Sequence, residues 1–565
     1  MGFISKKLGR VSPPDEAGRL GSEVSRRTFL ARASAGLIGV MLGPSLLLES
    51  CGPATASRAH IQGQLHGADH AVGHLLRQPG KLPAPSRTLR AEVVIVGGGV
   101  AGLSAKRWLH RQGVHDVLLL ELEEQVGGNA ASGRSEVSAY PWGAHYLPVP
   151  DARNRELLDF LHEAGTITGF DASNGLPIYN EYHLCHDPEE RLNIQGHWQI
   201  GLVPELGVPA ADRQQIARFF ALIEQLRQAK GQDGKDAFTI PVDHSSADEA
   251  FRQLDQLSFS AYLTREGFTS SYLRWYLDYC CKDDYGATAA NTSAWAGLHY
   301  FAARKGQGHN ANASDVLTWP EGNGFLVSHL RQASPNNILS QTLAYAIRET
   351  SDGLEVLAYD AKAGQSIRIE ARKVLLATPQ FITQRLLTGV ADAKTLACYH
   401  APWIVANLTV DGLPQGPGRP LCWDNVLYGS KSVGYVNANH QDLAMTADQR
   451  KVITCYYPLA DEAPDLARRA AYQTSYDEWL QRILTELETA HPGVTPHIMR
   501  AEIWVWGHGM IAPTPGFLWH SERLAATRPL RQKIFFAHTD LSGMSIFEEG
   551  FYQGIRAARE ILTFA

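Results

Sequence analysis

The chain has 565 residues, which is too long for one ordinary domain and long enough for two good hydrophobic cores. Hydrophobic residues make up 44% and charged residues 19%, a balance typical of folded soluble proteins. The net charge of −6 is weak and no stretch forms a basic stripe, which argues against nucleic acid as a partner.

The first fifty residues have the pattern of an export signal. A basic stretch precedes the apolar run 35–48, whose 14 residues are fewer than a membrane-spanning helix needs. Ser25-Arg26-Arg27-Thr28-Phe29-Leu30 resembles the twin-arginine signal. This resemblance implies export by the twin-arginine machinery after the protein has folded and taken up its cofactor. We therefore predict a twin-arginine-type signal peptide over residues 1–50.

The residues that follow the apolar run leave two cellular locations of the protein open. Leu48-Glu49-Ser50-Cys51 resembles a bacterial lipobox, although Glu49 departs from the small residues usual at its position. A lipid on Cys51 would attach a soluble body to the membrane, whereas an unmodified cysteine would leave it free. The expected location is therefore exported, either periplasmic or membrane-anchored through Cys51.

Residues 51–89 contain four prolines and are predicted to form a linker. Within them His66, His70 and His74 recur every fourth residue and would share one face of a helix, where a metal can bind. Nearby glycines and a proline weaken such a helix, so no metal site is predicted.

The six cysteines after Cys51 show no CxxC pair, which gives no sign of a zinc site or a thioredoxin-like site. Disulfides are compatible with export, but a chain of this size does not need them. The adjacent Cys280 and Cys281 are predicted to be core residues.

A dinucleotide-binding motif follows at residues 92–112. A β-branched strand over 92–96 leads into Gly97, Gly99 and Gly102 with the spacing G-x-G-x-x-G, and helical periodicity continues to residue 112. Gly97 allows the tight turn, Gly99 lets the backbone approach a pyrophosphate, and Gly102 lets helix and strand pack closely. The N-terminus of the helix then faces the anion.

A carboxylate narrows the choice of dinucleotide. The strand predicted over 117–120 ends at Glu121, nineteen residues beyond Gly102, where its side chain can accept hydrogen bonds from both ribose hydroxyls. The same carboxylate would repel a 2′-phosphate. NADP is therefore disfavoured, and NAD or FAD remains.

Three further segments favour FAD. The stretches 125–129, 142–146 and 536–558 resemble segments of the flavin amine oxidase and phytoene desaturase superfamily. The resemblance implies an α/β fold with a discontinuous Rossmann-like FAD-binding domain, an α+β substrate domain and a helical cap. It also implies these cofactor-binding residues besides those named above: Gly127, Gly128, Asn129, Gly143, Ala144, His145, Leu343, Asp540, Glu549 and Gly550.

The resemblance divides the chain into interleaved segments. The segments 317–325 and 374–379 resemble the family's passages between its two domains. The FAD-binding domain is expected to comprise residues 90–150, 316–380 and 506–565. The substrate domain is expected to comprise residues 151–315, with the helical cap, and 381–505.

The electrons are expected to come from the substrate, because no second G-x-G-x-x-G motif would bind NADH. Flavin N5 would then take a hydride from the substrate. Amine oxidases of the family place a lysine near N5 and two aromatic residues beside the amine; the resemblance puts Arg385 at the lysine position and Phe547 and Met510 at the aromatic positions. Arg385 cannot act as a neutral base, because a guanidinium stays protonated. His508 is open to a flavin contact or a structural role.

The middle of the chain, about residues 209–306, is rich in helical periodicity and aromatic residues. It is interpreted as a packed helical cap with solvated charges, or as the lining of a substrate tunnel in which Asp283, Asp284 or His299 meets a cationic ligand.

The sequence thus predicts an exported FAD-dependent oxidoreductase with a small-molecule substrate, an amine or polyamine, and oxygen, a quinone or another acceptor to reoxidise the flavin. Two alternatives stay open. One is a desaturase-like dehydrogenase of an apolar polyene. The other is a flavin-binding protein or isomerase without net redox turnover.

Overall fold

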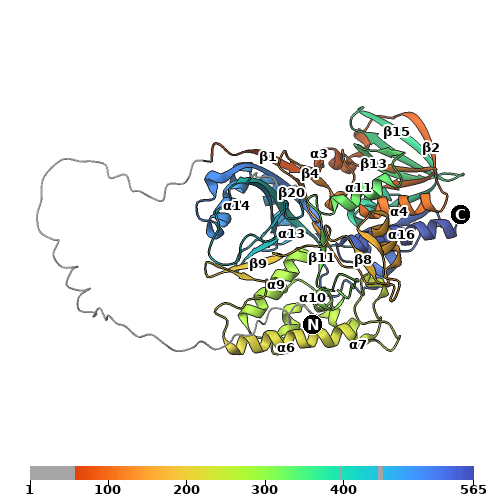
Figure 1. The fold of residues 1–565 in the computed structure, drawn as a ribbon. Coiled ribbons are helices and arrows are strands. Elements are labelled where there is room, and N and C mark those ends of the chain that lie inside the picture. Colours follow the sequence, from red (N-terminus) through yellow and green to blue (C-terminus); the bar gives the residue numbers. More distant parts are fainter. Residues whose placement is uncertain (1–57, 391, 393–395, 443–448, 565) are drawn as a thin grey trace, which may run out of the picture. The chain divides into compact units, whose positions relative to one another are not determined.

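The computed structural model describes residues 58–390, 392, 396–442 and 449–564. The predicted signal peptide, the motif Ser25–Leu30 and Cys51 lie outside these residues. Within them the chain forms two large β-sheets and a set of helices (Figure 1). None of the helices in the described residues combines the length and the apolar character needed to cross a membrane.

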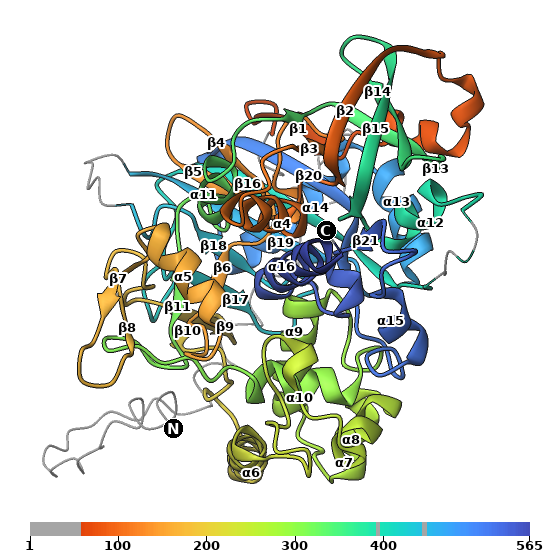
Figure 2. The same ribbon diagram turned by 90° about the vertical axis from the view of Figure 1, so that its right-hand side faces the viewer.

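The seven-stranded sheet carries the glycine motif. Its strand order is β12 (Ile338–Leu339), β3 (Val117–Leu120), β2 (Pro85–Val96), β15 (Gln365–Leu376), β14 (Leu354–Asp360) and β13 (Thr342–Glu349), with β21 (Ile534–Phe536) also on β15. Strands β12, β3, β2 and β15 pair in parallel with one another, whereas β14 pairs antiparallel with β15, and the four apolar residues of β3 are all buried. The helices α4 (Val100–Arg111), α11 (Gly324–Gln332) and α16 (Phe547–Thr563) cover it, with α4 and α16 side by side in Figure 2.

The eight-stranded sheet falls mostly in the part of the chain expected to be the substrate domain. Its order is β1 (Gln62–Gly67), β20 (Ile498–Ile511), β16 (His400–Asp411), β19 (Arg450–Pro458), β18 (Tyr435–Asn437), β17 (Asp424–Leu427), β9 (Glu190–Ile194) and β10 (His197–Ile200). The helices α13 (Pro464–Gln473) and α14 (Tyr476–Ala490) pack against it. Ser475 and Glu478 form a capping box that fixes the start of α14.

The middle of the chain is helical, as predicted: α6 (Ala210–Gln228), α7 (Glu249–Arg252), α8 (Phe259–Arg265), α9 (Ser271–Tyr285) and α10 (Ala294–Ala302). Figure 1 shows this layer in yellow to green below the eight-stranded sheet. Its aromatic residues form a buried cluster that includes Cys280 and Cys281. All six cysteines of the described residues are free thiols.

Shorter elements connect these layers. They are α5 (Arg155–Glu163), α12 (Gln380–Leu386), α15 (Ser521–Ala526) and the small strand pairs β4 (Ser132–Arg134) with β5 (Ala139–Pro141), β6 (Tyr146–Pro148) with β11 (Val316–Thr318), and β7 (Ile167–Phe170) with β8 (Pro177–Tyr179).

The segment expected to be a linker is instead structured from Arg58 onward. It forms β1, the short helices α3 (His70–Gly73), η1 (His74–Arg77) and η2 (Pro79–Lys81), and the start of β2. An edge strand such as β1 needs few apolar residues because backbone hydrogen bonds to β20 hold it. His66 therefore lies apart in β1, whereas His70 and His74 fall in the consecutive turns α3 and η1 with their ring centroids 5.7 Å apart; the described residues hold no cluster suited to a metal.

One predicted domain boundary also differs. The substrate domain was expected to end at residue 505, but β20 continues to Ile511 and stays paired with β16. Trp506 and Met510 thus belong to the eight-stranded sheet.

Candidate functional site

The glycine motif forms an open cradle at the start of α4. Gly97 has φ +105°, and a Cβ there would lie 2.4 Å from the carbonyl oxygen of Ala377. A Cβ at Gly102 would lie 1.9 Å from the Gly97 carbonyl oxygen, whereas one at Gly99 would have no heavy atom within 4 Å. Gly97 and Gly102 thus allow close packing, and Gly99 borders open space.

The second glycine segment completes this cradle. The Gly127 N–H donates to the Gly98 carbonyl oxygen at 2.8 Å. Gly127 and Gly128 have φ of +130° and +55°, which other residues rarely adopt. A Cβ at Gly128 would lie 3.5 Å from Cα of Gly99, so the two glycine segments are in contact.

Glu121 lies at the end of β3 against the same cradle. Its Oε2 accepts the Gly98 N–H at 2.6 Å and its Oε1 accepts the Glu123 N–H at 2.9 Å. Leu343 follows Thr342, whose N–H donates to the Glu121 carbonyl oxygen at 2.8 Å, so Leu343 lies near the same strand end. Both positions suit the adenosine end of a dinucleotide.

The cradle fits a dinucleotide pyrophosphate. Gly99 borders open space, α4 begins directly after it, and the first turn of α4 contains no acidic residue. The exposed N–H groups of a helix N-terminus attract a phosphate anion.

The acidic residues of the predicted closing motif are buried and hydrogen-bonded within the protein. Asp540 is fully buried and accepts hydrogen bonds from Nε2 of His400 at 2.9 Å and from the Gln380 N–H at 2.7 Å. Burial alone would raise the pKa of Asp540, but His538 and His400 hold it well below its usual range. Glu549 Oε1 accepts the Val242 N–H at 2.6 Å, and burial raises the pKa of Glu549 to about 8. Gly550 lies against Val100 and lets α16 pack on α4.

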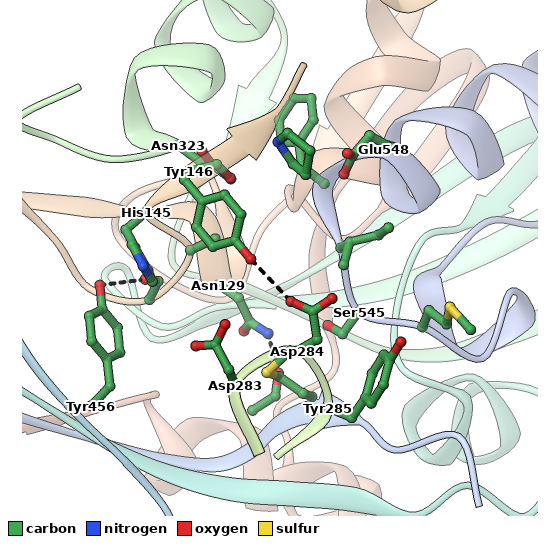
Figure 3. Close-up of a pocket in the computed structure, with 18 of the residues that line it drawn as sticks. Asn129, His145, Tyr146, Asp283, Asp284, Tyr285, Asn323, Tyr456, Ser545 and Glu548 are labelled. Atoms are coloured by element: carbon green, nitrogen blue, oxygen red, sulfur yellow. Dashed lines mark hydrogen bonds between the residues drawn. The ribbon is translucent and has the colours of Figure 1, made fainter. Parts of the chain in front are cut away.

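A pocket opens beside the second glycine segment (Figure 3). Six of the residues singled out in the sequence line it: Asn129, Gly143, Ala144, His145, Met510 and Phe547. Others were not predicted as site residues: Tyr146, Arg304, Asn323, Trp403, Tyr456, Trp506 and Glu548. Asp283, Asp284 and His299 line it too, which favours the tunnel interpretation of these positions over a cap with solvated charges.

One wall of the pocket is fixed by backbone hydrogen bonds. The Ala144 N–H donates to the Asn129 carbonyl oxygen at 2.9 Å, and the Tyr456 hydroxyl donates to the Gly143 carbonyl oxygen at 3.0 Å. The rings of His145 and Tyr456 lie 4.6 Å apart. Burial lowers the pKa of His145 to about 4, so this imidazole is neutral at pH 7.

The opposite wall is acidic. Arg304 Nη2 donates to both oxygens of Asp284 at 3.2 Å and to the Tyr146 hydroxyl at 3.0 Å, and that hydroxyl donates to Asp284 at 3.1 Å. Asp283, the neighbouring residue on α9, forms no ion pair with a described residue, and burial together with Asp284 raises its pKa well above the usual range. Figure 3 shows Asp283 and Asp284 facing the pocket from the same turn.

Glu548 adds a third carboxylate. It is 3% exposed, lies in the first turn of α16, and burial raises its pKa to about 7. His299 contributes no charge, because its Nε2 bonds to the Thr239 carbonyl oxygen at 2.7 Å and burial lowers its pKa to about 4. The pocket therefore holds more acidic than basic groups.

Two of the predicted catalytic residues, Arg385 and His508, do not line the pocket, and neither does Glu549. Arg385 is exposed on α12, so the role at the lysine position does not fit this structure. His508 is exposed and stacks on Phe381 at 4.4 Å, in accord with its structural interpretation. Glu549 faces Val242, while its neighbour Glu548 faces the pocket.

Comparison with known proteins agrees with this geometry. The family model for NAD(P)-binding Rossmann-like domains matches residues 95–164. A Mycobacterium tuberculosis protein described as a flavin-containing monoamine oxidase, AofH, is 47% identical over 62 residues, which are 11% of this chain and 13% of that protein. The sequence match thus spans about an eighth of the length of that relative.

Solved structures extend the likeness to most of the chain. A putrescine oxidase variant with redesigned cofactor binding matches with a TM-score of 0.60 and 17% identity, over 85% of this chain and 100% of that one. The chain therefore has the same overall fold as that putrescine oxidase. Cyclohexylamine oxidase from Brevibacterium oxydans also has this fold, with a TM-score of 0.56, 16% identity and coverage of 84% of this chain and 99% of that one.

Proposed function

We propose that the protein is an FAD-dependent oxidoreductase that oxidises an amine. The observation that carries this proposal is the charge of the pocket. Asp283, Asp284 and Glu548 line it, and Arg304 is the one arginine or lysine among its described lining residues. Arg304 is already paired with Asp284. A protonated amine would balance the remaining carboxylates, whose burial is otherwise unfavourable.

The glycine cradle supports FAD as the cofactor. Gly99 and the N-terminus of α4 would hold the pyrophosphate, and Glu121 would hold the ribose. The segment from Asn129 to Ala144 borders both the cradle and the pocket, which would bring the flavin end of the cofactor to the substrate. When bound, FAD would supply the acceptor for the substrate hydride.

The carboxylates would also manage the proton of the amine. An ammonium group must lose a proton before the neighbouring C–H bond can donate a hydride, because the nitrogen lone pair stabilises the iminium product. Burial raises the pKa of Glu548 to about 7, so its carboxylate can accept a proton near neutral pH. No lysine lines the pocket within the described residues, so the carboxylates would be the proton acceptors, a role that the guanidinium of Arg385 could not fill.

The aromatic wall would keep the reacting atoms dry. Trp403 and Tyr456 are buried and Trp506 is half-buried, and all three face the pocket from adjacent strands of the eight-stranded sheet. The Trp506 indole N–H donates to the Trp142 carbonyl oxygen at 2.6 Å, which fixes that ring. Exclusion of water strengthens the attraction between an ammonium group and the carboxylates.

The absorption spectrum of the purified protein tests the proposal. A flavin band near 450 nm is expected, and anaerobic addition of putrescine, spermidine, a monoamine or an amino acid should bleach it for at least one amine. A stable yellow spectrum with all amines would contradict amine oxidation. A colourless protein that cannot be reconstituted with FAD would contradict the cofactor as well.

A variant pair tests the role of charge. Asp283→Asn removes one pocket carboxylate, and we expect the amine concentration for half-maximal bleaching to rise. Asp278→Asn is the matched control, because Asp278 lies on the same helix but pairs with Lys282 outside the pocket. An equal effect of both substitutions would contradict a specific contact of Asp283 with the amine.

We also propose that the protein is exported by the twin-arginine machinery. The sequence Ser25–Leu30 supports this proposal. Replacing Arg26 and Arg27 by lysine should retain the FAD-loaded protein in the cytoplasm. Unchanged export of the double variant would contradict the proposal. Labelling of the wild type and of Cys51→Ala with a fatty-acid analogue tests lipidation.

A further inference from the structure

The N-terminal segment Gln62–Lys81 joins the two large sheets. Its strand β1 pairs in parallel with β20 of the substrate domain, from Gln62 opposite Arg500 to Gly67 opposite Val505. The chain then passes through α3, η1 and η2 before β2 enters the seven-stranded sheet. Figure 1 shows this red to orange path from β1 past α3 to β2.

This segment contacts the loop that carries Glu121. The Asp69 N–H donates to Glu123 Oε1 at 2.9 Å. The Glu123 N–H donates in turn to Glu121 Oε1 at 2.9 Å, and the Gly98 N–H donates to Glu121 Oε2 at 2.6 Å. A continuous series of hydrogen bonds thus runs from the N-terminal segment to the glycine cradle.

Apolar contacts hold the segment in the same place. Leu76 is 5% exposed and belongs to the buried cluster that also contains Leu120 and Leu343. Gly73 lies against Leu122, and a Cβ at Gly73 would lie 3.4 Å from Cδ2 of Leu122. The segment therefore packs beside the strand end at which Glu121 lies.

The other end of the segment is fixed by β1. His66 Nε2 lies 2.5 Å from Glu502 Oε2, and the His66 ring lies 5.0 Å from Trp142 and 5.9 Å from Trp504. Gly63 has φ +149°, and a Cβ there would lie 1.8 Å from the Ala501 carbonyl oxygen. The pairing of β1 with β20 therefore requires glycine at this position.

We propose that Gln62–Lys81 is a clasp that holds the Glu121 carboxylate in position for a dinucleotide ribose, with Glu123 as the positioning residue, and so slows release of the cofactor. The inference rests on the proposed binding of FAD. Glu121 must present both oxygens to two ribose hydroxyls, and a carboxylate already fixed by its neighbours loses less freedom on binding. Before FAD can leave, the ribose hydroxyls must separate from the fixed Glu121 carboxylate, or the clasp must open and free that carboxylate.

Glu123→Ala and Glu123→Gln test the positioning role in the full-length holoenzyme. Alanine removes the acceptor for the Asp69 N–H, whereas glutamine keeps an oxygen that can accept it. The readout is the rate at which free flavin fluorescence appears after dilution, which does not depend on turnover. Loss of one hydrogen bond to a charged group corresponds to release roughly 10-fold faster for the alanine variant, and glutamine should restore a rate close to that of the wild type.

Two further variants separate the clasp from general destabilisation. Glu124→Ala changes the neighbouring exposed carboxylate and should leave the release rate unchanged. Gly63→Val should detach β1 and accelerate release as Glu123→Ala does. Release at the wild-type rate from folded Glu123→Ala protein would overturn the proposal. Acceleration by Glu123→Gln or by Glu124→Ala as large as that by Glu123→Ala would overturn it as well. If wild-type protein binds no FAD, the proposed function fails and the clasp fails with it, whereas bound FAD with unchanged release refutes the clasp alone.

Discussion

Replacing Glu548 by glutamine is expected to stabilise the protein at alkaline pH while it weakens amine oxidation. Glu548 is 3% exposed and forms no ion pair with a described residue. Burial raises its pKa to about 7. The neutral form therefore suits the folded protein, and ionisation of this side chain opposes folding.

The size and sign of the effect follow from the pKa difference. In the unfolded chain a glutamate ionises near pH 4.3, so between about pH 4.3 and 7 the folded state holds one more proton than the unfolded state. Stability then falls as the pH rises through this window, by about 3–4 kcal/mol as an upper limit at roughly 1.4 kcal/mol per pKa unit. Glutamine has no charge to bury, so the loss should be absent from Glu548→Gln.

Thermal unfolding of the apoprotein at pH 5 and pH 8 measures this effect. The variant should unfold at a temperature close to that of the wild type at pH 5 and at a higher temperature at pH 8. Glu124→Gln, an exposed carboxylate, should show no such pH-dependent difference. If the stability difference between Glu548→Gln and the wild type does not grow with pH, the assignment of a buried, uncompensated carboxylate is wrong.

Two other substitutions test the cradle and the discarded base position. Gly99→Val should prevent FAD binding with little change in unfolding temperature, because no heavy atom lies within 4 Å of its Cβ position. Gly102→Ala should destabilise the fold itself, because its Cβ would lie 1.9 Å from the Gly97 carbonyl oxygen. The ratio of flavin to protein absorbance and the unfolding temperature distinguish the two effects. Arg385→Ala should leave the rate of flavin reduction by an amine unchanged, since Arg385 is exposed on α12. A fall of about 100-fold in this rate would show instead that Arg385 acts at the reacting site.

The dinucleotide-binding half was predictable because its pattern is local. The predicted strand 117–120 is β3 residue for residue, since four consecutive apolar side chains with turn residues on both sides fit a strand covered on both faces. Gly102 needed no long-range information either, because its close contact is with the Gly97 carbonyl oxygen five residues earlier. Gly97 has φ +105°, which the local turn requires, and its contact with Ala377 joins distant parts of the chain.

The N-terminal strand was not predictable for the opposite reason. Residues 62–67 are polar and mostly exposed, and only their pairing with residues 500–505 makes them a strand. The prolines around them predicted a linker, because composition says nothing about a distant strand partner. The histidine periodicity holds only for His70 and His74, which lie in consecutive helical turns, because His66 belongs to the strand β1.

The pocket residues show where motif resemblance reaches its limit. Glu548 and Glu549 are neighbours on α16, and successive helical residues point about 100° apart, so the rotation of the helix decides which of the two faces the pocket. The resemblance selects Glu549, whereas the rotation of α16 about its axis turns Glu548 inward. Arg304, Trp403 and Tyr456 come from three separate elements whose meeting depends on the whole fold.

The parallel pairing of β1 with β20 also sets an order for biosynthesis. Gln62 finds its partner Arg500 only after almost the entire chain has left the ribosome. The first strand that follows the predicted signal peptide is therefore among the last to be placed. A truncated or misfolded chain would leave this strand unpaired, close in sequence to the predicted export signal, so an unpaired β1 would report at the N-terminus that the C-terminal half has not folded.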